Sequence, residues 1–170
     1  MLYRETIFLT GFPGFIAGRL VERLAKPETQ FYLLVQPQFV DKAMDEIEEI
    51  AELTNTPLES YVIVEGDITQ PNLGIANEDL QTILFETTDV FHLAAAYDLA
   101  VPKDIAFNVN LEGTKNVNDL VRAVRNLRRI TTSRPVMLLE SVRARYLRLS
   151  SNTMPGFAIT TKKPSIWPSV

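Results

Sequence analysis

The chain has 170 residues, which is enough for one domain with a sizeable core and too few for two ordinary domains. Hydrophobic residues make up 46% of the chain and charged residues 22%, the balance of a soluble globular protein. The net charge of −4 argues against nucleic acid as the main partner, and the absence of cysteine excludes a disulfide framework, a thiolate metal site and a cysteine nucleophile.

The sequence predicts neither a membrane span nor a secretion signal. The most apolar stretch, residues 90–101, is interrupted by His92 and Asp98 and is too short to cross a bilayer. The N-terminus carries Glu5 and lacks a basic segment followed by a long apolar one. We therefore expect a cytoplasmic protein, and its single histidine gives no sign of a metal cluster.

Short apolar runs predict four buried strands, at residues 7–10, 31–35, 61–64 and 90–94. Periodic segments between and after them predict helices from Ile16 to Leu24, over 41–53 with Asp41 as the N-cap, over 78–84 and over 103–127. Strands that alternate with helices predict an α/β fold, a doubly wound parallel sheet with helices on both faces.

The charge changes sign late in the chain. Residues 1–129 carry 11 basic and 20 acidic side chains, whereas residues 130–170 carry 6 basic side chains and one acidic side chain. A break of this size marks a linker or a tail. We therefore expect one folded domain over residues 1–129 and an atypical basic tail over residues 130–170.

A glycine-rich segment, TGFPGFIAG at residues 10–18, lies between the first predicted strand and the first predicted helix. In this context Gly11 allows a tight turn out of the strand, Gly14 allows close approach of a pyrophosphate, and Gly18 allows close packing of helix on sheet. The N–H groups at the start of the helix then face the phosphates. The alternative is that the glycines serve only the turn.

This segment resembles the T-G-x-x-G-F-x-G fingerprint of extended short-chain dehydrogenases/reductases. Three further segments match that family in order: GDI at 66–68, HLAAAYD at 92–98 and NVNLEGTKN at 108–116. The segments FYLLVQP and VEGDITQPNLG are most similar in sequence to the fatty acyl-CoA reductase branch of the family, also called the male-sterility or thioester-reductase-like branch. The resemblance covers roughly residues 4–129.

The resemblance implies a Rossmann fold, here truncated after about four β-α units, with a bound nicotinamide dinucleotide. It implies that Asp67 accepts a hydrogen bond from the adenine amino group and that residues 94–96 lie beneath the nicotinamide ribose. Asn110 is implied to be the remaining member of the catalytic set, with a structural and proton-relay role. The implied cofactor-binding residues are Thr10, Gly11, Phe12, Gly14, Phe15, Ile16, Gly18, Gln36, Asp67, Ile68, Ala94, Ala95 and Ala96.

Some of these residues also have a purely structural interpretation. Asp67 could cap a turn, Asn110 could face solvent, and His92 is better explained as a core histidine with satisfied hydrogen bonds than as a catalyst. Cofactor choice depends on the end of the second strand, where Gln36 is neither the basic residue typical of NADP nor the acidic one typical of NAD. Because the branch uses NADPH, we expect NADP(H) over NAD(H).

The pair of residues that carries out proton transfer in this family, Tyr-x-x-x-Lys, is absent. None of the five tyrosines has a lysine four residues later; they are Tyr3, Tyr32, Tyr61, Tyr97 and Tyr146. The sequence after Arg129 also gives no sign of the fifth strand that the family has. We therefore expect the chain to hold the dinucleotide-binding half of a reductase of fatty acyl-CoA or acyl thioesters, and to be catalytically incomplete. The alternatives are a stand-alone or non-functional NAD(P)-binding fragment, or a relative of NAD-dependent epimerases/dehydratases.

A frameshift near the codons for Arg129 and Ile130 would explain both the charge break and the missing pair. In the shifted frame, residues from Ile130 can read HYVSTCYVAG, which resembles a fifth strand with its Ser/Thr. Residues 159–169 can read NYYEETKYLAE, which contains Tyr-x-x-x-Lys. The alternatives are a disordered tail, or a genuine one in which residues 137–149 form a basic amphipathic helix.

Overall fold

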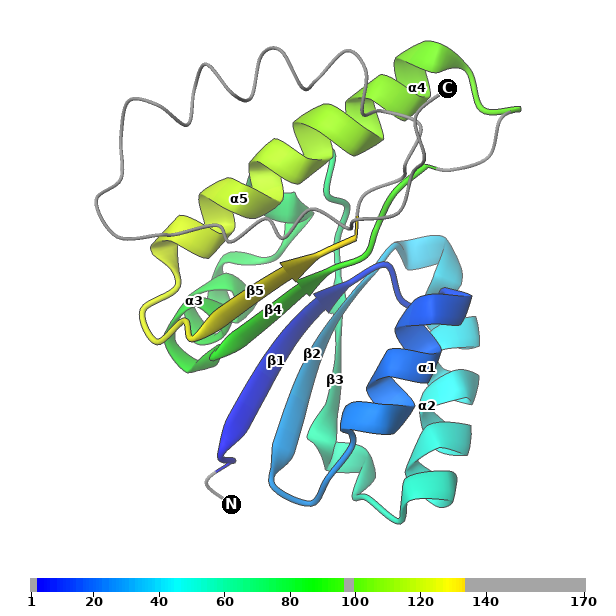
Figure 1. The fold of residues 1–170 in the computed structure, drawn as a ribbon, viewed down its shortest axis with the longest axis vertical. Coiled ribbons are helices and arrows are strands. Elements are labelled where there is room, and N and C mark those ends of the chain that lie inside the picture. The colour runs from blue at the N-terminus through cyan, green and yellow to red at the C-terminus, as the bar shows by residue number, and fades with distance from the viewer. Residues whose placement is uncertain (1–2, 97–99, 134–170) are drawn as a thin grey trace, which may run out of the picture. The chain divides into compact units, whose positions relative to one another are not determined.

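The computed structural model describes residues 3–96 and 100–133, which form a parallel five-stranded sheet with helices on both faces (Figure 1). The strand order is β3-β2-β1-β4-β5. The strands are β1 (Glu5–Thr10), β2 (Thr29–Val35), β3 (Tyr61–Glu65), β4 (Asp89–His92) and β5 (Arg129–Thr132). The predicted doubly wound α/β sheet is therefore confirmed.

The helices alternate with the strands along the chain. They are α1 (Phe15–Leu24), α2 (Val40–Thr54), α3 (Asn77–Glu86), α4 (Lys103–Phe107) and α5 (Thr114–Ala123), and α4 continues into α5 through a π-helical turn, Asn108–Gly113. Short 3₁₀ turns, Pro37–Phe39, Leu58–Ser60 and Pro71–Gly74, lie in the connections. In Figure 1, α1 and α2 lie on one side of the sheet, and α3 and α5 lie on the other.

The sheet is buried on both faces because β1 and β2 each contain an uninterrupted apolar run, residues 7–9 and 31–35. Ile7 and Leu9 of β1 belong to the core cluster that contains α1 and α2, whereas Phe8, between them, belongs to the cluster that contains α3 and α5. Successive side chains of a strand point to opposite faces, so an uninterrupted apolar run fills both cores at once. This explains why the central strands could be recognised from the sequence.

The prediction of four strands was wrong, because Arg129–Thr132 pairs with β4 as a fifth strand. Its sequence, RITT, has one apolar residue, Ile130, and all four residues are exposed. Such a strand is defined by backbone hydrogen bonds to its neighbour and not by burial, so it carries no apolar signal. The predicted boundary at residue 129 falls on the first residue of this strand, and the predicted tail lies outside the described residues beyond Ser133.

Two helix details also differ from the prediction. Asp41 is not the N-cap of α2 but lies in its first turn, because a 3₁₀ turn precedes the helix and makes Phe39 the cap. The long helix predicted over 103–127 ends at Ala123 and contains the π-helical turn. Within the described residues, no helix combines the length and the apolar character that a membrane crossing requires.

Candidate dinucleotide site

The candidate site lies at the carboxyl ends of the parallel strands. Strand β1 pairs with β2 on one side and with β4 on the other, so the connections after β1 and β4 diverge from this point. Ligands of open α/β sheets bind in the crevice formed where connections diverge in this way. The glycine-rich turn follows β1 and residues 94–96 follow β4, so both lie at this edge, where Gly11 packs against the Ala94 backbone. Most of the residues predicted from the sequence are therefore at one edge of the sheet.

Gly11 and Gly14 shape the turn. Gly11 has φ +96°, in the left-handed region, and a Cβ atom there would lie 2.7 Å from the backbone nitrogen of Ala94. A Cβ atom on Gly14 would lie 2.6 Å from the carbonyl oxygen of Gly11. Both positions therefore require glycine, because any larger residue would push backbone atoms apart.

The start of α1 is suited to an anion. Gly14 is the N-cap, no side chain caps the helix, and the first turn contains no acidic residue. The first N–H groups of a helix have no carbonyl partner within the helix and carry a partial positive charge. A pyrophosphate fits this arrangement.

Gly18 does not have the predicted role. A Cβ atom there would meet the carboxylate of Glu46 on α2, which is the end of a flexible side chain, and not the sheet. The neighbouring residue Ala17 is buried in the same core cluster as Ile7 and Leu9 of β1. Close packing of α1 on the sheet therefore depends on the small side chain of Ala17, one residue earlier than predicted.

The other predicted residues of the turn differ in exposure. Thr10 is fully buried beneath the turn, and Phe12 belongs to the core cluster. Phe15 and Ile16, at the start of α1, are 83% and 67% exposed. Only the last two are therefore accessible through their side chains, and Thr10 and Phe12 support the turn from below.

His92 connects three parts of the site. Its Nδ1 lies 2.7 Å from Thr10 Oγ1, and its Nε2 lies 3.1 Å from Thr114 Oγ1 on α5. The Ala94 N–H donates to the same Thr10 hydroxyl, at 3.3 Å. In the arrangement that uses all three groups, Thr10 donates its hydrogen to Nδ1, and the Nε2–H of neutral His92 donates to Thr114.

Burial supports this assignment, because it lowers the pKa of His92 to about 4. The ring is 3% exposed and both of its nitrogens have partners. The interpretation of His92 as a satisfied core histidine is therefore confirmed. The histidine joins the end of β1, the end of β4 and helix α5.

Asn110 fixes the connection after β4. Its Oδ1 accepts a hydrogen bond from the Ala96 N–H and its Nδ2 donates to the Ala96 carbonyl, both at 2.8 Å. Asn110 is half-buried within the π-helical turn, a local widening often found at functional sites. The interpretation as a solvent-facing polar residue is therefore wrong. Residues 94–96, also half-buried, are held in one conformation next to the glycine-rich turn.

Gln36 and Asp67 meet at the ends of β2 and β3. The Gln36 Nε2 donates to Asp67 Oδ2 at 2.9 Å. Asp67 Oδ1 accepts from both the backbone N–H and the hydroxyl of Thr69, each at 2.8 Å. Asp67 therefore does cap a turn, and this structural role occupies its carboxylate together with the contact to Gln36.

Ile68 is buried and lies against the helix that follows β4. A Cβ atom on Gly113 would lie 2.7 Å from Ile68 Cδ1, so this glycine lets the π-helical turn approach the β3 connection. Asn116 donates from Nδ2 to the carbonyls of Ile68 and Gln70, at 2.8 and 3.2 Å. The predicted role of Ile68 next to adenine stays a prediction, since its side chain is used in packing.

Sequence reasoning missed three residues at this edge: Thr114, Asn116 and Lys42, whose Nζ donates to the Pro13 carbonyl at 3.2 Å. Thr114 and Asn116 lie within the segment NVNLEGTKN, so a search of that motif for every hydrogen-bonding side chain would have found them. Lys42 had no signal of its own, because it lies on a helix otherwise dominated by acidic residues.

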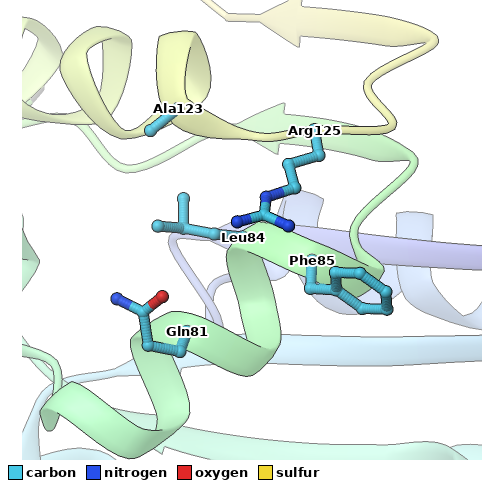
Figure 2. A pocket seen from close by; sticks show the side chains of 5 residues that line it. All are labelled: Gln81, Leu84, Phe85, Ala123 and Arg125. Carbon is cyan, nitrogen blue, oxygen red and sulfur yellow. The ribbon is translucent and has the colours of Figure 1, made fainter.

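Two hollows lie beside the helices, one far from the glycine-rich turn and one next to it. One, of about 330 Å³, is lined by α3, α5 and Arg125, whose guanidinium lies over the Phe85 ring (Figure 2). It lies near the C-terminal ends of these helices, where β4 and β5 begin, and so at the opposite edge of the sheet from the glycine-rich turn. The second, of about 450 Å³, lies between α1 and α2, and its lining joins Pro13, Phe15 and Gly18 of the glycine-rich segment to Lys42 and to acidic side chains of both helices.

The fold and the crevice define a class of protein, the NAD(P)-binding Rossmann domains. Within that class, the family model described as male sterility protein matches residues 9–140, so the chain belongs to this family. It is the NAD(P)-binding domain of the extended short-chain dehydrogenase/reductase and fatty acyl-CoA reductase type, as the sequence resemblance predicted.

Individual relatives agree with this assignment. Fatty acyl-CoA reductase wat of Drosophila melanogaster is 28% identical over 92% of this chain and 32% of its own length. Fatty acyl-CoA reductase 1 of Arabidopsis thaliana is 30% identical over 68% of this chain and 28% of its own. The chain therefore spans about a third or less of the length of these curated relatives.

Solved structures share the fold. The terminal R domain from the myxalamid PKS-NRPS biosynthetic pathway is 26% identical, with a TM-score of 0.61 over 75% of this chain and 34% of that one. Yeast methylglyoxal/isovaleraldehyde reductase Gre2, complexed with NADPH, has a TM-score of 0.58 over 75% of this chain and 36% of its own, and is 17% identical. The second likeness concerns the fold alone.

Proposed function

We propose that this chain binds NADP(H) across the carboxyl ends of its strands, and that it is the dinucleotide-binding half of a reductase of fatty acyl-CoA or acyl thioesters. The observation that carries the proposal concerns Gly11 and Gly14, which lie between the start of α1 and the connection after β4 and have no room for a side chain. A Cβ atom at either position would overlap backbone atoms, so the two glycines allow the tight turn that brings the uncapped N–H groups of α1 to this edge of the sheet.

Each part of the edge has a binding role in this proposal. The N–H groups at the start of α1 hold the pyrophosphate, and the Asp67 region receives the adenine. Residues 94–96, fixed by Asn110, support the nicotinamide ribose. In a complete reductase, the bound dinucleotide would supply a hydride to the thioester carbonyl. Asn110 keeps the backbone beneath the ribose in place, since its amide oxygen and its amide nitrogen both bind the backbone of Ala96.

Proton transfer is the missing function. The sequence contains no Tyr-x-x-x-Lys pair, so no tyrosine with a lysine one helical turn away can protonate the substrate oxygen. We therefore expect this chain to bind the dinucleotide without turnover, and a longer protein with the pair to catalyse the reduction. A stand-alone binding module is the second candidate, and the absence of the pair is the observation that favours it.

Titration of the purified chain with NADPH and NADH, followed by nucleotide fluorescence, tests binding. A matched pair of variants tests the site. Gly14→Ala places a methyl group against the Gly11 carbonyl and should abolish binding, whereas Gly18→Ala meets only the flexible Glu46 side chain and should retain it. If folded wild-type protein binds neither nucleotide at millimolar concentration, the proposal is wrong. Consumption of NADPH with a long-chain acyl-CoA would contradict the expected lack of turnover.

The origin of the tail is a separate part of the proposal. We propose that a frameshift near the codons for Arg129 and Ile130 removed the missing pair, which the charge reversal after residue 129 supports. Resequencing the gene tests this, because an unbroken frame in several related genomes would exclude it. The cytoplasmic location stays a prediction that cell fractionation would test.

A further inference from the structure

Four arginines lie within eight residues, from the last turn of α5 to the first residue of β5. They are Arg122, Arg125, Arg128 and Arg129, all of them exposed, and no acidic residue lies among them. Residues 1–129 carry 11 basic and 20 acidic side chains, so more than a third of the positive charge of an acidic domain is concentrated here. We call residues 122–129 the arginine segment.

Two of these arginines have no acidic partner. Arg122 and Arg129 each pair with a carboxylate of the domain, whereas Arg125 and Arg128 form no ion pair within the described part of the chain. The Arg125 guanidinium lies 5.8 Å from the centre of the Phe85 ring, at the hollow between α3 and α5 (Figure 2). Phe85 is itself 59% exposed. The arginine segment therefore presents positive charge beside an accessible aromatic side chain.

Helix α2 carries the opposite charge. It contains six acidic residues and one basic residue. In its second half Glu48, Glu49 and Glu52 are exposed, and none of them forms an ion pair with a residue that the structure describes. The last turn has no basic residue, although the partial negative charge at the end of a helix favours cations. Leu53, beside these carboxylates, is 73% exposed. We call residues 48–53 the acidic surface.

The arginine segment and the acidic surface cannot meet within one copy of the chain. Helix α2 packs with α1 on one face of the sheet, and Val124 and Leu127 of the arginine segment pack with α3 and α5 on the other face (Figure 1). The sheet and both layers of buried side chains lie between the two surfaces. The charge of one surface can therefore be neutralised by the other only if a second copy supplies it.

We propose that the arginine segment of one copy docks on the acidic surface of a second copy. Arg125 and Arg128 then pair with carboxylates of α2, and Leu53 enters the hollow between α3 and α5. The contact is heterologous, because the two surfaces differ and each added copy leaves one of each kind free. Copies therefore add head to tail unless a ring closes. This association is independent of the proposed dinucleotide binding.

The association is sensitive to salt. The charges on both surfaces are exposed, so added salt screens them, and the net charge of −4 on each copy opposes association. We expect self-association at high protein concentration and low salt that is reversed at high salt. Pairing through the exposed edge of β5 would depend on backbone hydrogen bonds and would not be reversed in this way.

Sedimentation velocity of the full chain, over about a hundredfold range of protein concentration, measures the association. At low salt the mean mass of the wild-type chain should rise with concentration. Two double variants each reverse the charge of one surface: Arg125→Glu with Arg128→Glu, and Glu49→Arg with Glu52→Arg. Each double variant should associate about tenfold more weakly than the wild-type chain.

An equimolar mixture of the two double variants provides the sharper test. Each variant keeps one wild-type surface, and the two kept surfaces complement each other, so the mixture should associate although neither variant does so alone. The control is Lys103→Glu with Lys115→Glu, which makes the same change of net charge at exposed positions outside both surfaces. The control should associate as the wild-type chain does.

Several results would overturn the proposal. The wild-type chain could stay monomeric at the highest concentration and low salt, or the mixture of folded variants, checked by circular dichroism, could fail to associate. Equal weakening by the lysine control would show a general effect of charge and would also exclude the contact. If the chain stays monomeric and binds vesicles that contain phosphatidylserine, the arginines serve a membrane surface and the proposal is wrong. NADPH binding by the variants should be unchanged, so its loss would concern the proposed function instead.

Discussion

The two ends of the candidate site are held by different kinds of contact. At the β4 end, His92 and Asn110 bind backbone and buried hydroxyl groups, so residues 94–96 are fixed by the core. At the β2–β3 end, Gln36 and Asp67 bind each other through half-buried side chains. A ligand can replace a contact between two side chains more easily than a contact to the backbone. Substitutions at the β4 end should therefore lower stability, whereas those at the β2–β3 end should mainly alter ligand preference.

The largest effect is expected from Gly11→Ala, at the junction with β4. The new methyl group would overlap the Ala94 backbone in a left-handed conformation, and we expect a loss of roughly 4 kcal/mol in the free energy of unfolding. The matched change is Gly74→Ala, at φ +65° with no heavy atom closer than 3.5 Å, which should cost only about 1 kcal/mol. Urea denaturation measures both, and equal losses would contradict the tight junction.

The next effect concerns pH. His92 has a pKa of about 4 when folded, against an ordinary value of 6.5, so protonation favours the unfolded chain. Its contribution to stability is complete above the ordinary value and is lost as the pH falls towards 4. Between about pH 7.5 and about pH 5 the wild-type chain should lose about 2 kcal/mol more than His92→Gln, which cannot titrate there. Identical pH profiles for the two proteins would show that His92 does not titrate as proposed.

A pair of asparagines allows the two ends to be compared directly. Asn110→Ala and Asn116→Ala each remove two bonds from a side chain to backbone carbonyl or N–H groups, at the β4 end and the β3 end respectively. We expect Asn110→Ala to lower stability by about 2 kcal/mol and to weaken NADPH binding while 5′-AMP binding is retained. Asn116→Ala should lower stability less and weaken both ligands. The opposite pattern would reverse the assignment of the two ends.

The smallest effect is expected from Gln36→Glu. The new carboxylate would face Asp67 Oδ2 across the present 2.9 Å contact, which should cost about 1 kcal/mol at neutral pH and be reduced by salt. Gln38→Glu, at an exposed position two residues later, is the control and should change stability by less than about 0.5 kcal/mol. Thermal denaturation at low and high salt measures the difference. A larger loss for the control would contradict the Gln36–Asp67 contact.

The sequence predicted the alternation of strands and helices and the position of the glycine-rich turn, because buried parallel strands and tight glycines leave local signals. It missed β5, since RITT forms a strand only through pairing with β4. It assigned close helix packing to Gly18, one residue away from Ala17, because residue spacing alone does not show which side of α1 faces the sheet.

By itself, the sequence determined the class of fold, the glycines of the tight turn after the first strand, and the absence of a Tyr-x-x-x-Lys pair. These are properties of single segments. The tertiary structure alone decided that His92 is an internal connector, that Asp67 is engaged by Gln36 and Thr69, and that Lys42 lies against the glycine-rich turn. Apart from the local bond between Asp67 and Thr69, each of these contacts joins residues far apart in the chain or on different elements, so its formation depends on how the strands and helices pack and not on local sequence.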